Sequence, residues 1–188
     1  VRRALYGIIP LGLKYVYPFG QTVYPFEGEL KEEPSDEEIV SSLLAYQFHP
    51  SLAFLGRDAS IRRSKRTGMP REVLRDGLTM GYIRPSDGMF IPSLEGARVM
   101  LEHLPPGIAR VVVRERFAET VARGTTVFVK FVKRADPKIR PKSEVFVVNE
   151  EDELLATGRS LLSGEEYRDF HQEHQFILVR RHVKPREG

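Results

Sequence analysis

The 188-residue chain contains no cysteine and no tryptophan. Without cysteine it cannot form disulfides, iron–sulfur clusters, thiol nucleophiles or zinc sites that need thiolate ligands. No apolar run approaches the roughly 20 residues that span a bilayer. The first residues, Val1 to Gly7, also lack the apolar core of a secretion signal. These features predict a cytoplasmic protein that uses no metal and no other cofactor.

The residues that are present have the balance of a folded protein. Hydrophobic residues make up 41% and charged residues 29% of the chain, which is typical of globular domains. The length suits one large domain or two small ones. The strongest break, Pro105-Pro106-Gly107, predicts a boundary between residues 1–107 and 108–188. We therefore expect an α+β protein of two small domains.

The first half begins with a proline-rich segment and continues into a helix. Residues 1–35 contain four prolines, which forbid a long helix and favour short strands and an extended arm. Ser35 or Asp36 is predicted to cap a helix that ends at Pro50, because acidic residues in a first helical turn oppose the helix dipole.

Turn and capping residues predict the remaining elements. Asp76-Gly77 indicates a β-hairpin, Phe90-Ile91 a short strand, and Ser93 the start of a second helix. The second half is predicted to be a small, mainly β domain. Its strands are expected at 110–114, 127–132, 144–148, 154–162 and 176–183, with helices at 115–123 and 163–170.

Basic residues are distributed unevenly along the chain. Residues 1–107 carry 13 basic and 13 acidic side chains, whereas residues 108–188 carry 16 and 13. The segment 130–142 has six basic residues against Asp136 alone, and the segment 57–84 has eight against three acidic ones. Clusters of this kind favour binding to a phosphate backbone.

A series of short motifs in the second half has a characteristic order. The motifs are Val111-Val112-Val113, Ala122-Arg123-Gly124, Val127 to Val132, Ala135-Asp136-Pro137, Ile139-Arg140-Pro141, Glu144-Val145 and Leu155 to Arg159. In this order and spacing, residues 108–184 resemble a PUA domain, named after pseudouridine synthase and archaeosine transglycosylase. The resemblance implies a small β pseudobarrel that binds structured RNA.

Motifs in the first half narrow this resemblance. They are Tyr17 to Gln21, Tyr46-Gln47-Phe48, Arg63 to Gly68, Arg84 to Gly88 and Ser93 to Ala97. They resemble the segment that precedes the PUA domain in archaeal tRNA-guanine transglycosylases and archaeosine synthases. Nearly the whole chain is thus similar to the C-terminal third of those enzymes, whose appended domains bind tRNA while a separate barrel exchanges the base.

The chain departs from that family in lacking the residues that catalyse base exchange. The carboxylate pair of the catalytic barrel cannot be placed here, and the family's zinc site, which uses cysteines, cannot form. We therefore expect a non-catalytic protein whose partners are structured RNA, in particular tRNA, and a separate transglycosylase subunit. An RNA-binding assembly factor in ribosome biogenesis is the alternative, because PUA domains also occur there. An enzyme with an unrecognised site is a third hypothesis.

Gly124 is the first candidate for an RNA contact. A glycine at this position can end a helix with a positive φ, and its missing side chain can let backbone N–H groups approach an RNA phosphate. In PUA domains the corresponding glycine lies on the RNA face. The two interpretations are compatible.

Cationic side chains are the other candidates for contacts with RNA phosphates. The alternative is that they form a charged surface that only keeps the protein in solution. In the second half they are Lys130, Lys133, Arg134, Lys138, Arg140, Lys142, Arg159, Arg180, Arg181 and Lys184, together with Thr125 beside the glycine. In the first half they are Arg62, Arg63, Lys65 and Arg66. Strand alternation predicts that Lys130 lies opposite Val129 and Phe131.

Aromatic and acidic residues allow further hypotheses. Phe128, Phe131 and Tyr82 could stack on bases, but their apolar surroundings favour core packing. The pair His171 and His174 has metal-like spacing without a third ligand nearby, which favours a surface role. The run 150–153 is interpreted as an acidic turn between strands.

Overall fold

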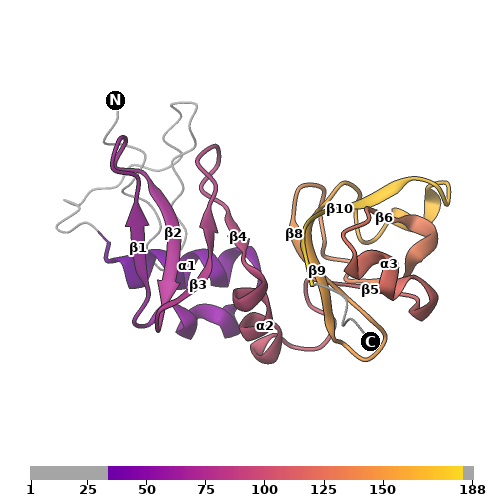
Figure 1. Cartoon of the computed structure of the whole chain (residues 1–188), viewed down its shortest axis with the longest axis horizontal. Helices are drawn as coiled ribbons and strands as arrows, with labels where there is room; N and C mark the ends of the chain where they lie inside the picture. The colour runs from indigo at the N-terminus through magenta and orange to yellow at the C-terminus, as the bar shows by residue number, and fades with distance from the viewer. Residues whose placement is uncertain (1–33, 184–188) are drawn as a thin grey trace, which may run out of the picture.

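The computed structural model describes residues 34–183, which form two α+β bodies side by side (Figure 1). The predicted N-terminal arm, the motif at Tyr17 to Gln21 and the candidate Lys184 lie outside these residues. The described helices include none that is long and apolar enough to cross a membrane.

The first body is an antiparallel four-stranded sheet with helices packed against it. Its strands follow chain order: β1 (Ser60–Arg63), β2 (Pro70–Arg75), β3 (Leu78–Ile83) and β4 (Phe90–Pro92). The helices are α1 (Asp36–Gln47), the 3-10 helix η2 (Pro50–Gly56) and α2 (Leu94–His103).

Local signals set these elements as the sequence predicts. The Ser35 side chain accepts the Glu38 N–H at 3.2 Å, and the Glu38 carboxylate accepts the Ser35 N–H at 2.8 Å. This reciprocal pair satisfies two donors at the start of α1. Asp76 and Gly77 have φ of 50° and 77°, the left-handed values that a tight two-residue hairpin requires. Ser93 caps α2 by accepting the Gly96 N–H at 2.8 Å.

The second body is a six-stranded mixed sheet that curls into a barrel-like shape (Figure 1). The strand order is β6-β10-β9-β8-β5-β7. The strands are β5 (Arg110–Val113), β6 (Val127–Phe128), β7 (Val132–Ala135), β8 (Glu144–Val148), β9 (Leu154–Ser160) and β10 (Gln175–His182). The predicted helix at 115–123 is a 3-10 helix, η3 (Glu115–Phe117), that continues into the short α3 (Ala118–Ala122).

The prediction of one strand over 127–132 is wrong. The segment breaks into β6, the 3-10 helix η4 (Val129–Phe131) and the start of β7. β6 pairs with β10, whereas β7 pairs with β5, so the two strands occupy opposite edges of the sheet. The apolar run of this segment is therefore the corner that closes the barrel.

The predicted helix at 163–170 is also wrong. Only Tyr167–Asp169 (η5) is helical, as a single 3-10 turn. A Cβ at Gly164 would lie 1.9 Å from the Asp136 carbonyl oxygen, and the Gly164 N–H donates to Ile139 at 2.9 Å. The segment is thus held against the 136–139 loop, which prevents a continuous helix. β9 likewise ends at Ser160, two residues before the predicted end.

Arg110 fixes the connection between the two bodies. Its side chain is 3% exposed, and its guanidinium donates to the carbonyls of Leu101, Pro105 and Ile108 at 3.0 to 3.2 Å. Its Nε pairs with Asp152 at 2.7 Å. Buried charges are retained when they are paired and hydrogen-bonded. The proline-rich connection is therefore held against β5 by a side chain of β5 itself.

Strand β8 is buried on both faces and joins the two hydrophobic cores. Val145 and Val147 lie in the core of the second body. Phe146 and Val148 lie in the core of the first body. The Phe146 ring packs against Phe48, with ring centroids 5.6 Å apart. Side-chain alternation along one strand thus couples the two bodies.

Replacing Phe146 with Ala should lower the free energy of unfolding by about 3 to 5 kcal/mol, the usual cost of a cavity left by a buried aromatic ring. Urea unfolding followed by circular dichroism measures this change. Phe170→Ala is the matched control, because Phe170 is 38% exposed, and it should cost much less. Equal effects of the two variants would contradict the role of β8 at the junction.

Candidate nucleic-acid interface

The Gly124 turn has the predicted backbone, and it also makes a contact that the sequence did not indicate. Gly124 has φ of 92°, and its N–H donates to the Val121 carbonyl at 2.8 Å. A Cβ there would lie 2.7 Å from the ring of His182, whose Nδ1 is 2.8 Å from the Ala122 carbonyl oxygen. The glycine therefore also provides space for the end of β10. Its N–H is used within the turn, while Thr125 is exposed.

The cations of segment 130–142 are divided among acidic partners from other segments. Lys130 Nζ lies 2.8 Å from Glu173, Lys133 pairs with Glu150, and an Arg140 nitrogen lies 4.0 Å from Glu165. Exposed pairs of this kind contribute little to stability, but each reduces the local positive field. The charge density read along the sequence thus overstates the free charge of this surface.

Several predicted cations keep their charge unpaired within residues 34–183. Arg134, Lys138 and Lys142 are exposed and form no ion pair there. Lys65 and Arg66 lie in the exposed β1–β2 loop and likewise form no ion pair within residues 34–183. These side chains are the ones best able to meet a phosphate backbone.

Arg62 and Arg63 are tied to acidic neighbours. Arg62 pairs with Glu72 at 2.5 Å, and Arg63 pairs with Asp36 at 2.7 Å. Burial alone raises the pKa of Asp36, but the hydrogen bonds from Arg63 and from the Ile61 N–H, with the charge of Arg63, lower it overall. Asp36 therefore connects the start of α1 to β1 in its ionised form.

Lys130 faces outward as predicted, but for another reason. Val129 and Phe131 are buried and Lys130 has a side chain 37% exposed, yet the segment is η4 and not a strand. Phe131 is a core residue, as expected. The prediction of core packing fails for Tyr82, which is 36% exposed and lies under the Arg181 guanidinium at 4.8 Å.

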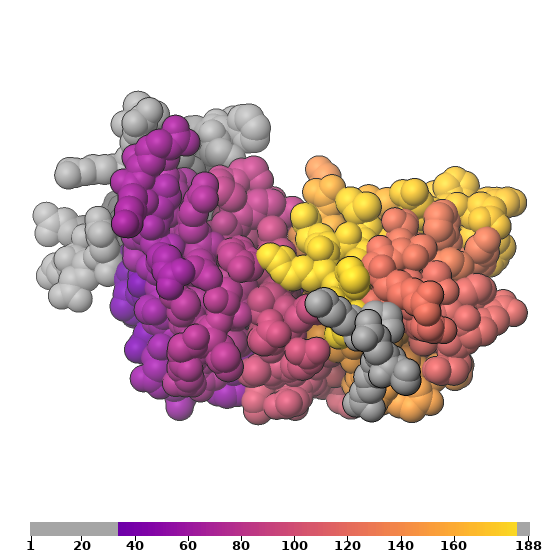
Figure 2. Space-filling model, viewed as in Figure 1, coloured from indigo at the N-terminus to yellow at the C-terminus, as the bar shows by residue number. Residues whose placement is uncertain are grey.

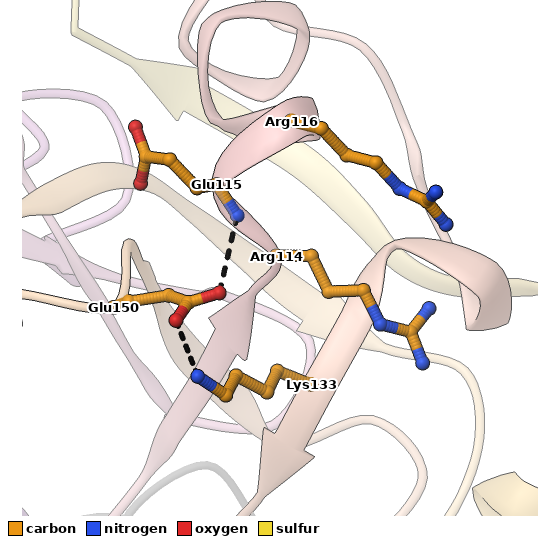
Figure 3. Close-up of a pocket in the computed structure, with 5 residues that line it drawn as sticks. All are labelled: Arg114, Glu115, Arg116, Lys133 and Glu150. Carbon is orange, nitrogen blue, oxygen red and sulfur yellow. Dashed lines mark hydrogen bonds and ion pairs between the residues drawn. The ribbon is translucent and has the colours of Figure 1, made fainter.

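A shallow pocket places Arg114 and Arg116, which the sequence did not single out, beside the candidate Lys133 (Figure 3). It is lined by Arg114, Glu115, Arg116, Lys133 and Glu150. In Figure 3 the Glu150 carboxylate lies between Lys133 Nζ and the backbone N–H of Glu115, which it accepts at 3.3 Å. The Arg116 guanidinium lies 4.7 Å from the Phe117 ring. The elements that form this pocket are far apart in sequence, so no local pattern could reveal it.

A second cationic cluster lies where the two bodies meet. Arg180 donates to the Glu144 carboxylate at 3.1 and 3.2 Å. Arg84, from the β3–β4 loop, approaches the same carboxylate at 3.6 Å, and Arg159 faces Glu144 across the β8–β9 pair. Burial raises the pKa of Glu144 against the opposing charges of Arg180, Arg84 and Arg159.

The loop that carries Arg84 repeats the β1–β2 loop. Ser64 N–H donates to Met69 and Gly68 N–H to Ser64, both at 2.8 Å. Arg84 N–H donates to Met89 and Gly88 N–H to Arg84 at the same distances. In the sequence, the likeness of the two loops is visible as a Gly-Met pair, Gly68-Met69 in one and Gly88-Met89 in the other, which follows Ser64 and Arg84 at the same spacing. Figure 1 shows both loops at the same end of the sheet.

The acidic run 150–153 and the histidine pair His171 and His174 form no metal site among the described residues. Residues 150–153 form the predicted turn between β8 and β9, built on Asn149, whose side chain accepts the Glu151 and Glu153 N–H groups. His171 and His174 have ring centroids 6.2 Å apart and are exposed. Within the part of the chain described, no three His, Asp or Glu side chains converge on a potential metal site.

Two known domain families match this chain. Residues 109–183 match the PUA domain, and residues 38–107 match the patch-forming domain C2 of tRNA-guanine transglycosylase. The chain is a PUA-domain protein that also carries a C2 domain. Neither matched domain is a catalytic barrel.

The particular relatives are archaeal, and the two domains resemble the C-terminal domains of archaeosine transglycosylase. The chain is 60% identical over 185 residues to the tRNA-guanine(15) transglycosylase of Korarchaeum cryptofilum, covering 98% of this chain and 31% of the relative. It is 42% identical over 165 residues to that of Pyrococcus furiosus, covering 86% and 28%. The chain thus spans about a third of the length of these relatives.

A solved structure supports the fold. A hypothetical protein of Pyrococcus horikoshii OT3 superposes with a TM-score of 0.65 at 21% identity, covering 80% of this chain and 92% of that one. Both bodies described above therefore have counterparts within one known structure.

The ion pair in the pocket of Figure 3 can be tested directly. The hydrogen bond from Lys133 lowers the pKa of Glu150 below its ordinary 4.5, with a weaker opposing effect of burial. Replacing Lys133 with Met should return this pKa toward 4.5, as followed by carbon-13 NMR of the carboxyl group across a pH series. Lys130→Met, which removes a pair with Glu173, should leave Glu150 unchanged. An unaltered Glu150 titration in the Lys133 variant would contradict the geometry.

Proposed function

We propose that this chain binds structured RNA, in particular tRNA, in the cytoplasm. In this proposal it acts as a non-catalytic accessory to tRNA-guanine transglycosylation, and a separate catalytic subunit exchanges the base. Its mechanism is recognition of RNA shape through phosphate contacts, which suits folded RNA better than a base sequence.

The observation that carries the proposal is the extent of the match to one kind of relative. The 60% identity extends over 98% of the chain, so it includes the C2 domain, the PUA domain and their connection. The relative is named for a reaction on tRNA, and the matched residues are 31% of its length. In such a protein the catalytic barrel exchanges the base, so the C2 and PUA domains are the part best suited to binding the tRNA.

The surface supports the same proposal. Cations that form no ion pair with another residue of the described range 34–183 are available on both bodies, at Lys65 and Arg66 on the first and at Arg134, Lys138 and Lys142 on the second. Gly124 and Thr125 remain proposed contacts on the PUA domain, together with Lys130, Lys133, Arg140, Arg159, Arg180, Arg181 and Arg63. We keep the boundary at residue 107 as a proposal, with the two domains held together through β8.

Filter binding of a tRNA transcript and of a ribosomal RNA fragment, each across a salt series, tests the function. We expect the tRNA to bind more tightly, with an affinity that falls steeply as salt rises. Equal binding of both RNAs would favour the assembly-factor alternative. Absence of tRNA binding at low salt would reject the proposal.

Single cations can be tested on both domains. Arg66→Gln and Arg134→Gln should each weaken tRNA binding and reduce the slope of log K against log salt by about 0.9, the value for one lost phosphate contact. Arg98→Gln is the matched control, because Arg98 is exposed on α2 and pairs with Glu95. If all three variants have the same slope, these two arginines do not contact the RNA.

A further inference from the structure

The junction of the two domains contains more positive charge than its acidic partners, Glu144 and Asp87, can neutralise. Arg84, Arg159 and Arg180 surround the single carboxylate of Glu144, whose side chain is 2% exposed. The Arg84 side chain is only 15% exposed, so water screens its charge weakly. Arg84 also pairs with Asp87 at 2.9 Å, so within residues 34–183 three guanidinium groups face two carboxylates and one positive charge remains in excess.

Nitrogen donors of these arginines that have no acceptor among the described residues also indicate a site for an anion. The Nε of Arg159 is buried and has no hydrogen-bond partner within the part of the chain described. A buried donor left unpaired is costly, and such cases call for an explanation. Arg84 uses its Nε on Asp87 and one terminal nitrogen toward Glu144. Arg180 uses two of its three nitrogens on Glu144.

The position of the cluster explains why it is charged. Alternation along β8 places Glu144 on the same side of the strand as Phe146 and Val148, which pack in the core of the first domain. Glu144 is thus the polar end of a buried row that is otherwise apolar. Beside it, Arg181 of β10 covers Tyr82 of β3. Figure 2 shows the yellow surface of the C-terminal strand meeting the surface of the first domain.

We propose that Arg84, Arg159 and Arg180 form a binding site for one phosphodiester group of RNA at the junction between the two domains. Glu144 is the positioning residue, since its carboxylate holds Arg180 and attracts Arg84 from the opposite domain. Guanidinium groups suit this ligand because their planar N–H pairs match phosphate oxygens. One phosphate bound there would contact both domains, so the RNA would be read across the junction.

This inference rests on the proposed function, and tRNA binding gives its first test. Arg159→Met and Arg84→Met should each weaken tRNA binding about tenfold, since each removes charge-assisted hydrogen bonds to a phosphate. The salt slope should fall by about 0.9 in each variant. Arg98→Met removes the same charge from an exposed position and should change the affinity much less.

The variants differ in how they bear on folding. Arg159 is partly buried, so thermal unfolding of the Arg159→Met variant is measured before its tRNA binding. Arg84 lies in a loop whose backbone hydrogen bonds do not need its side chain, so Arg84→Met provides a second, independent variant. If the unmodified chain binds tRNA and both folded variants bind it as Arg98→Met does, the junction site is wrong while the proposed function stands.

Inorganic phosphate supplies the second test on the unmodified chain. In nitrogen-15 NMR, millimolar phosphate should shift the Arg159 Nε–H signal in a saturable way and leave that of Arg98 unchanged. A shift without tRNA binding would support an anion site and reject RNA as its ligand. Equal, non-saturable changes at Arg159 and Arg98 would overturn the site itself.

Discussion

The packing of Phe146 against Phe48 is the contact on which the arrangement of the two domains depends. It places alternate residues of β8 in two different cores, so that the strand belongs to both domains at once. A junction built on a polar linker alone would leave the domains free to rotate. Here an apolar strand face, supported by the buried guanidinium of Arg110, fixes their relative positions and hence the geometry of every cation near the boundary.

The same junction explains why charge gathers around Glu144. Burial raises the pKa of the Glu144 carboxyl group, and the nearby charges of Arg180, Arg84 and Arg159 oppose this rise only in part. Arg180 and Arg84 reach this carboxylate from different domains. Away from the junction the acids act differently, because Glu150 and Glu173 pair with single lysines at exposed positions. Where cations outnumber acids is therefore set by the fold.

Local signals predicted much of the first domain. The capping box at Ser35, the Asp76-Gly77 turn and the Ser93 cap each act within a few residues, so the sequence alone specifies them. The corner at Val129–Phe131 could not be predicted, because an apolar run looks the same in a strand and in a turn buried by its neighbours. The failure at 163–170 has a similar cause, since the contact of Gly164 with Asp136 is made 28 residues away.

By itself the sequence determined which segments are helical or extended at strong caps and turns, that cysteine chemistry is excluded, and that the chain resembles a PUA protein. Its clusters of basic residues also gave the candidate positions for contacts with a phosphate backbone. Only the tertiary structure decided which of those charges remain free, because ion pairs such as Lys130 with Glu173 join residues far apart in the chain. It also brought Arg84 beside Arg180, since two domains must dock before their side chains can share one carboxylate.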